Sequence, residues 1–103
     1  MVITREHARG VLDIVANVLC QSIVEKSVYI SSDIMADSSI VQDNGMKICS
    51  PYKMFFLGFV DEAPKANWSH SCKYVFINAI DGYHHVVHGD WPPVMLDSLE
   101  KIL

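Results

Sequence analysis

The chain has 103 residues, of which 8 are Lys or Arg and 12 are Asp or Glu, and its formal net charge is -4. One hydrophobic core serves this length and two would each be marginal, so we expect a single domain over residues 1–103. The acidic balance, with no basic cluster, excludes binding to a phosphate backbone, so another protein, with a basic surface, is the expected partner instead of nucleic acid.

The segment from Ile3 to about Lys26 predicts one long amphipathic helix. Apolar residues recur there at helical spacing, and polar residues step by four along the opposite side. Thr4 suits an N-cap, and Glu6 lies favourably near the positive end of the helix dipole. The apolar residues of this helix are Ala8, Val11, Leu12, Val15, Val18, Leu19 and Ile23.

The same segment could also be interpreted as a secretory signal, because two arginines precede an apolar run over residues 10–20. Asp13 and Asn17 interrupt this run, so we reject that alternative. No stretch approaches the roughly 20 uninterrupted apolar residues that cross a bilayer. We therefore expect a cytoplasmic protein with no membrane partner.

Strands are expected in the middle of the chain. The β-branched and aromatic residues Ser27–Ser31 predict a short strand, and the polar residues 32–39 predict irregular structure. Residues 40–41 and 46–49 flank Asp43-Asn44-Gly45, which predicts a hairpin. The almost continuously apolar run Met54–Val60 predicts a core strand that is covered on both faces.

A second hairpin is predicted from Lys73–Ile77 and Tyr83–His88, with Asp81-Gly82 at its tip. A two-residue loop would place Phe76 opposite Val87, whereas a loop that starts at Asn78 would shift this register.

The chain then ends in a predicted short helix over Val94–Leu103, where Met95, Leu99 and Ile102 share a helical face and Pro93 suits its start. Together these elements predict an α+β fold in which the long N-terminal helix packs on a four- or five-stranded antiparallel meander.

Three cysteines, Cys20, Cys49 and Cys72, cannot all be paired within one chain. Their spacing contains no CxxC element of a zinc ribbon or redox site, and free thiols fit a reducing compartment. One disulfide with a spare cysteine is the alternative.

A zinc site is one alternative function, because histidine and cysteine are zinc ligands. Its candidate ligands are His70, Cys72, His84 and His88. Their spacing matches none of the standard zinc patterns, and strand alternation places His85 on the face opposite His84 and His88. We therefore expect no metal and no cofactor.

A thiol enzyme is the other catalytic alternative. An imidazolium from His70 or His85 would lower the pKa of Cys72 and make it a nucleophile. Against this interpretation, cysteine is among the most buried residue types, so we favour an inert Cys72 at the start of a strand.

Two loops carry candidate binding residues. Trp68 and Trp91 lie next to segments that contain proline, where a large aromatic side chain either packs against the sheet or serves as an exposed binding anchor. Asp61 and Glu62 begin the first of these loops, and Tyr83 follows the second hairpin tip. An exposed strand edge is the alternative contact surface.

One stretch, from Tyr74 to Val87, resembles a known family. Its order of strand, polar residue, glycine turn and second strand is similar to the terminal hairpin of PepSY-type domains and related protease propeptides. The resemblance covers 14 residues. It implies a non-catalytic inhibitory or folding module of secreted or membrane-attached proteins, and it carries over no catalytic residue.

The sequence therefore favours a non-enzymatic protein-binding module, such as an inhibitor, an immunity protein or a regulatory domain. The alternative is a thiol- or zinc-dependent enzyme centred on His70, Cys72 and His85. A third interpretation, a subunit of a homodimer, follows from the positive mean hydropathy of +0.21.

Overall fold

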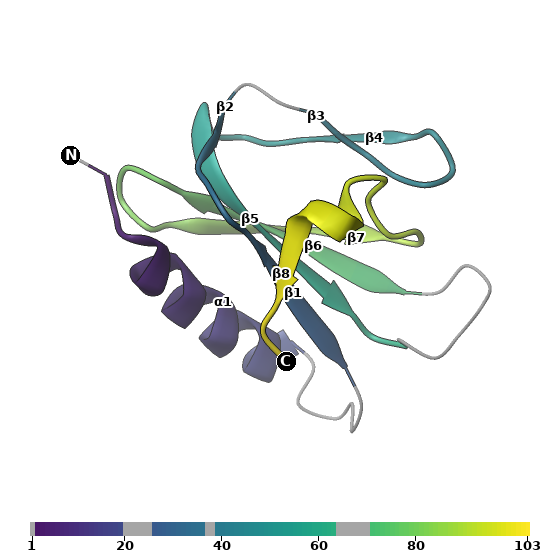
Figure 1. Ribbon diagram of the computed structural model, residues 1–103, viewed down its shortest axis with the longest axis horizontal. Helices are drawn as coiled ribbons and strands as arrows, with labels where there is room; N and C mark the ends of the chain where they lie inside the picture. Colours follow the sequence, from purple (N-terminus) through teal and green to yellow (C-terminus); the bar gives the residue numbers. More distant parts are fainter. Residues whose placement is uncertain (1, 20–25, 37–38, 64–70) are drawn as a thin grey trace.

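The computed structural model describes residues 2–19, 26–36, 39–63 and 71–103, and it shows an α+β fold (Figure 1). One helix, α1 (Arg5–Leu19), packs on one face of a mostly antiparallel sheet. The strands are β1 (Ser27–Ser31), β2 (Met35–Ala36), β3 (Ser39–Val41), β4 (Lys47–Cys49), β5 (Met54–Asp61), β6 (Cys72–Asn78), β7 (His84–Gly89) and β8 (Leu99–Lys101), with a 3-10 turn, η1 (Leu96–Ser98), before the last one.

The main sheet has six strands in the order β7-β6-β5-β1-β8, and β2 pairs with β5 beyond the end of β1. The strands β3 and β4 form a separate two-stranded sheet. The prediction of four or five strands was therefore wrong, since the described residues form eight. The predicted meander holds for β5, β6 and β7 only, because β1 and β8 reach the sheet from the two ends of the chain.

Helix α1 forms where the sequence predicts it. The Thr4 Oγ1 accepts a hydrogen bond of 3.1 Å from the His7 N–H, which caps the first turn. The helix buries one stripe against the sheet, and the predicted extension to about Lys26 passes through residues 20–25, which lie outside the described part. The buried residues are Ala8, Leu12, Val15 and Ala16.

Strand β5 is covered on both faces, as predicted. One face belongs to a core under α1 that includes Phe56 and Val60. The other face belongs to a core that includes Phe55 and Phe59, and the β3–β4 hairpin covers it. The molecule therefore has three layers, which are helix, six-stranded sheet and hairpin (Figure 1).

The β3–β4 hairpin confirms its turn prediction. Gly45 has a φ of 88°, in the region that favours glycine, and the Gln42 N–H donates to the Met46 carbonyl at 2.9 Å.

The β6–β7 hairpin has the longer of the two loops considered. Phe76 pairs with His85 instead of Val87, and Ile77 pairs with His84. The Asn78 side chain accepts from the Ile80 N–H at 3.0 Å, and the Asp81 side chain accepts from the Tyr83 N–H at 2.9 Å. These two side-chain turns hold residues 79–82 outside the ladder.

The predicted C-terminal helix is wrong. Only the single turn η1 is helical, and the residues after it form β8, which pairs with β1. The main-chain bonds continue past β8, because the Ile102 N–H donates to the Val28 carbonyl at 2.8 Å. Within the described residues, no helix is long and apolar enough to span a bilayer.

Candidate functional site

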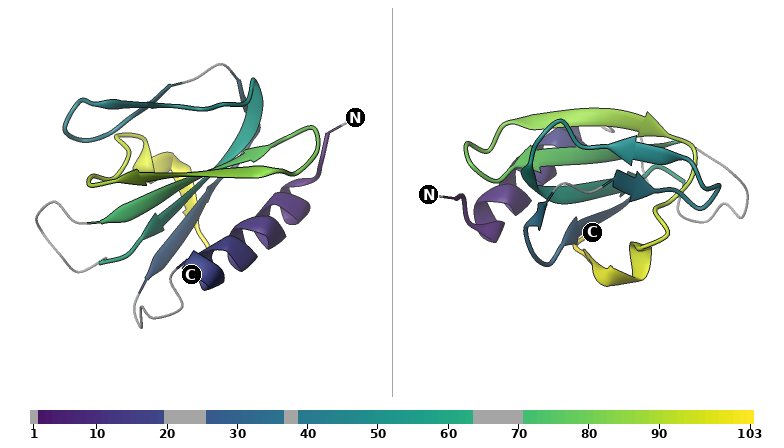
Figure 2. Two further views of the ribbon diagram at one scale, coloured as in Figure 1. Left: turned by 180° about the vertical axis from the view of Figure 1, so that it is seen from behind. Right: turned by 90° about the horizontal axis from the view of Figure 1, so that it is seen from above.

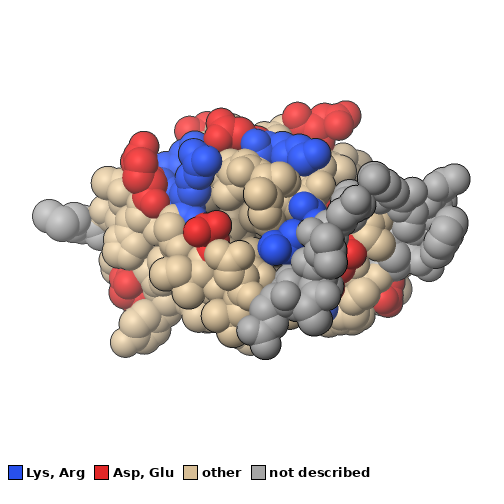
Figure 3. Space-filling model, turned by 90° about the horizontal axis from the view of Figure 1, so that it is seen from below, with Lys and Arg blue, Asp and Glu red and all other residues tan. Residues whose placement is uncertain are grey.

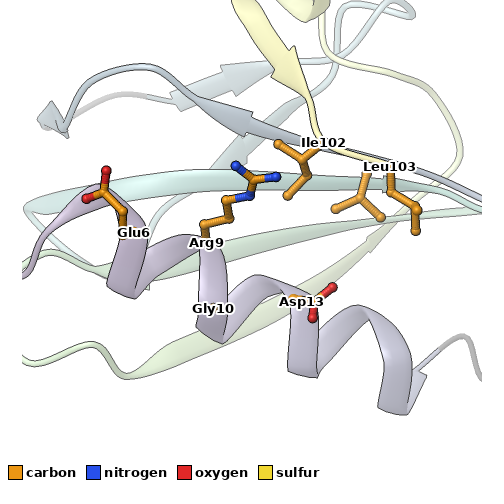
Figure 4. Close-up of a pocket in the computed structure, with 7 residues that line it drawn as sticks. Glu6, Arg9, Gly10, Asp13, Ile102 and Leu103 are labelled. Atoms are coloured by element: carbon orange, nitrogen blue, oxygen red, sulfur yellow. The ribbon is translucent and has the colours of Figure 1, made fainter.

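Helix α1 has a hollow along each flank, and the first is polar. Its volume is about 370 Å³, and it lies between α1 and the residues that follow β8. Arg9 extends from the helix toward Ile102, with the carboxylates of Glu6 and Asp13 on either side of it along the helix (Figure 4). Both signs of charge therefore meet in this hollow.

The second flank is apolar. Two adjoining hollows, of about 380 and 170 Å³, share Ile14, Val15 and His84 and form a single groove between α1 and β7. We call this the α1/β7 groove, and none of the described residues that line it is Lys, Arg, Asp or Glu. The residues that line it are Val11, Ile14, Val15, Val18, Leu19, Tyr52, Gly82, Tyr83, His84 and Val86.

The helix side of this groove exposes large apolar side chains. Ile14 is 66% exposed and Val18 is 67% exposed, although both continue the helical apolar pattern. The sheet accommodates only the stripe that contains Leu12 and Val15, so the next row of apolar residues remains beside it in solvent. Figure 3 views the molecule from below: charged residues lie along its upper border, in its middle and at both sides, with a tan area between them below the centre.

The strand side of the groove is an open sheet edge. Strand β7 is the outermost strand, and no described strand pairs with its outer edge (Figure 2). The Asn78 N–H donates to the Tyr83 carbonyl at 2.7 Å, so Asn78 and Tyr83 are a hydrogen-bonded pair. From this pair onward, hydrogen-bonded and non-hydrogen-bonded pairs alternate along β6 and β7. In an antiparallel pair every second residue turns its N–H and C=O away from the neighbouring strand.

On β7 the residues that turn their main chain outward are His84, Val86 and His88. The side chains of His84 and Val86 lie on the helix-covered face, in the groove itself. The free hydrogen-bonding groups of β7 and the exposed apolar flank of α1 therefore adjoin along one line.

Tyr52 and Tyr83 close one end of the groove. Tyr83 is 72% exposed and lies next to the hairpin tip. Burial raises the pKa of the Tyr52 phenol, and the carboxylate of Asp81 raises it further. The Tyr52 hydroxyl therefore stays neutral and can donate a hydrogen bond to an occupant of the groove.

At the other end of β7 lies a chain of polar contacts on the same face. The Lys73 Nζ lies 2.6 Å from the Glu62 Oε1 and 3.5 Å from the His88 Nδ1. The His88 Nε2 in turn lies 3.2 Å from the Asp90 Oδ1. Glu62 and His88, which the sequence marks as binding and metal candidates, are thus joined through Lys73.

Cys72 lies on the opposite face of the sheet. It is 1% exposed, and its thiol donates to the Trp91 carbonyl at 3.4 Å, an oxygen that also accepts from the Tyr74 hydroxyl at 2.6 Å. Burial raises the pKa of the Cys72 thiol to about 12, and the carboxylates of Asp61 and Asp90 add to this. The thiol is therefore protonated at neutral pH and is a poor nucleophile.

The structure does not bring the candidate catalytic and metal residues together. Cys72 pairs with Gly89 while His85 pairs with Phe76, so the two candidates lie four positions apart along the ladder, about 13 Å at strand spacing. His84 and His88 lie on the other face from Cys72, and His70 lies outside the described residues. Within the described ranges, no three His, Cys, Asp or Glu side chains converge to hold a metal ion.

The candidate binding residues separate as well. Trp68 lies outside the described residues, and Trp91 is half-buried, with its carbonyl in the sheet core. Asp61 is half-buried, and its carboxylate accepts from the Ala63 N–H at 3.0 Å. Cys49 and Cys72 are free thiols. Of the predicted set, Tyr83 and His84 meet in the α1/β7 groove.

No family model, curated protein or solved structure matches this chain. The similarity of residues 74–87 to PepSY-type hairpins therefore stays a prediction.

Proposed function

We propose that this chain is a non-enzymatic protein-binding module, in the class of inhibitors, immunity proteins or regulatory domains. It binds its partner by accepting an extended segment as an additional strand on β7. The single observation that carries this proposal is the continuity of the open β7 edge with the apolar flank of α1.

Strand addition suits both halves of this surface. The outward N–H and C=O groups of His84, Val86 and His88 supply main-chain hydrogen bonds that do not depend on the sequence of the added strand. Alternate side chains of that strand project onto the helix-covered face, where Ile14 and Val18 receive them. Main-chain bonds then give affinity, and the groove selects apolar side chains.

The surface also departs from the usual protection of sheet edges. Natural proteins blunt an edge strand with lysine, proline or an inward-pointing charge. The residues of β7 are His, His, Val, Val, His and Gly, so the strand has none of these devices. An unprotected edge beside exposed apolar side chains indicates a surface that is covered when the protein is in use.

The test is selection of random peptides displayed on phage against the purified protein. We expect selected peptides to share apolar residues at alternate positions, and to lose binding to Val86→Pro and to Ile14→Asp. The Val86 N–H points away from β6, so proline there blocks an added strand without removing a bond of the β6–β7 ladder.

Two matched variants control this experiment. Val86→Ala shortens the same side chain but keeps the N–H, so it should retain most of the binding that Val86→Pro loses. Asp13→Asn changes the opposite flank of α1 and should leave binding unchanged. Selected peptides that bind Val86→Pro as tightly as the parent protein would contradict strand addition at β7.

A further inference from the structure

The outer edge of β7 has a symmetry that the proposed function does not require. Its outward-facing residues are His84, Val86 and His88, so the edge presents the same order of side chains when it is followed in either direction. An interface between identical copies must be self-complementary about a two-fold axis. Paired with its own copy about an axis at Val86, this edge places Val86 opposite Val86 and each His84 opposite a His88, with no Lys, Arg, Asp or Glu in any of these pairs.

From this symmetry, and building on the proposed function, we infer that the strand added to β7 is the β7 strand of a second copy of this chain. The two strands run antiparallel about a two-fold axis through Val86. Val86 then exchanges both main-chain hydrogen bonds with its own counterpart, and His84 exchanges them with His88 of the second copy.

The pairing also places the apolar surfaces correctly. The two-fold axis is perpendicular to the sheet, so side chains that lie on the helix-covered face of one copy join the same face of the other. The exposed flanks of both helices, with Ile14 and Val18, then face each other across the paired strands. The two Val86 side chains form the floor between them.

The response to salt distinguishes a second copy from a basic foreign strand at this edge. Each copy carries a net charge of -4, so two copies repel at long range, yet among the described residues no Lys, Arg, Asp or Glu lines the α1/β7 groove. Salt screens long-range repulsion, with a screening length of about 8 Å at 0.15 M. Added salt should therefore strengthen self-association, whereas it would weaken binding of a basic partner.

The experiment is sedimentation velocity of the full chain over a range of protein concentrations. We expect a concentration-dependent dimer, which Val86→Pro abolishes and Val86→Ala retains. A double variant with lysine at both outer histidine positions, His84→Lys with His88→Lys, places like charges opposite each other in both cross-strand pairs. This double variant should raise the dissociation constant of the dimer by about tenfold.

The companion double variant, His84→Glu with His88→Glu, should be weakened in the same way. An equimolar mixture of the lysine and glutamate variants should restore the dimer as a mixed species, because each lysine then lies opposite a glutamate. A variant that had merely lost its fold could not be rescued by mixing. His85→Lys, on the other face of the same strand, is the matched control and should leave the dimer intact.

The outcomes separate this inference from the proposed function. A chain that stays monomeric at all concentrations, while selected peptides still lose binding to Val86→Pro, overturns the second copy and leaves strand addition standing. A dimer that survives both Val86→Pro and the lysine pair uses another surface and overturns the inference. Restoration of the dimer in the mixture supports both strand addition at β7 and a second copy as the added strand.

Discussion

Gly58 on β5 and Leu12 on α1 touch so closely that no side chain fits between them. A Cβ added to Gly58 would lie 2.5 Å from the Leu12 Cδ1 and 3.0 Å from its Cδ2. The backbone of Gly58 has no positive φ, so glycine is needed here for space and not for its conformational freedom. This contact sets how deeply the helix settles on the sheet, and hence the depth of the α1/β7 groove.

Gly58→Ala should therefore destabilise the protein. Leu12 is fully buried, so its side chain must leave its rotamer or push the helix outward, at a cost of about 1–3 kcal/mol in the free energy of unfolding. Urea denaturation measures this cost. The double variant with Leu12→Ala should lose less stability than the sum of the two single variants, because the added Cβ fills part of the cavity; strict additivity would contradict the contact.

Gly10→Ala is the matched substitution on the helix, and it should act in the opposite direction. A Cβ at Gly10 meets nothing within 4 Å, and the position lies inside α1. Alanine is a better helix former than glycine by about 1 kcal/mol, so the free energy of unfolding should rise by about that amount. An unchanged or lower midpoint in urea would show that residue 10 is not helical in solution.

Cys72 and Cys49 should differ sharply in their reaction with iodoacetamide. Cys49 is exposed, whereas Cys72 is buried with a pKa raised to about 12. Only the thiolate reacts, so at pH 8 under native conditions Cys72 should be alkylated more slowly by about a hundredfold or more. Peptide mass mapping over time measures both rates, and urea should make them similar. Rapid alkylation of Cys72 under native conditions would support the alternative in which Cys72 is a reactive nucleophile.

The raised pKa values of Cys72 and Tyr74 also predict loss of stability in alkali. Burial raises both pKa values, so above the unfolded thiol value of 9.0 the unfolded chain releases protons that the folded chain retains. The contribution is complete below pH 9 and is lost as the pH rises toward 12. The unfolding free energy should therefore fall over this range, and Cys72→Ala should make that fall less steep.

Local signals carry much of the fold. The helical stripe of α1, the β-branched residues of β1 and the glycine turn at Gly45 each specify their element within a few residues. The β6–β7 register needs two further local signals, since the Asn78 and Asp81 side chains form turns that lengthen the loop. Both residue types favour such turns, so the longer loop has a recognisable signature.

The candidate site was harder to predict because it consists of what the fold leaves uncovered. The pattern that places Val18 in a helical stripe gives no measure of how wide a stripe the sheet can bury. Ile14 and Val18 lie beyond that width, at 66% and 67% exposed. The open edge of β7 follows from strand order, and strand order is decided by contacts between residues far apart in the sequence.

The chain end shows tertiary structure overriding a local pattern, and proline substitution tests it. Met95, Leu99 and Ile102 have helical spacing, but a helix of ten residues is marginal, and without β8 the strand β1 would be an open edge of the sheet. The strand β8 covers that edge, and the Ile102 N–H donates to Val28 while the Lys101 N–H points outward.

Ile102→Pro should therefore cost about 1–3 kcal/mol more in unfolding free energy than Lys101→Pro, because it removes a hydrogen bond of the ladder. Ile102→Ala separates the lost side chain from the lost hydrogen bond, and urea denaturation of the three variants gives the comparison. In a C-terminal helix both positions would lie in the same hydrogen-bonded turn, and proline would be harmful at either one. Equal losses of unfolding free energy at positions 101 and 102 would thus support a C-terminal helix. The difference expected here requires the alternating hydrogen bonds of a strand.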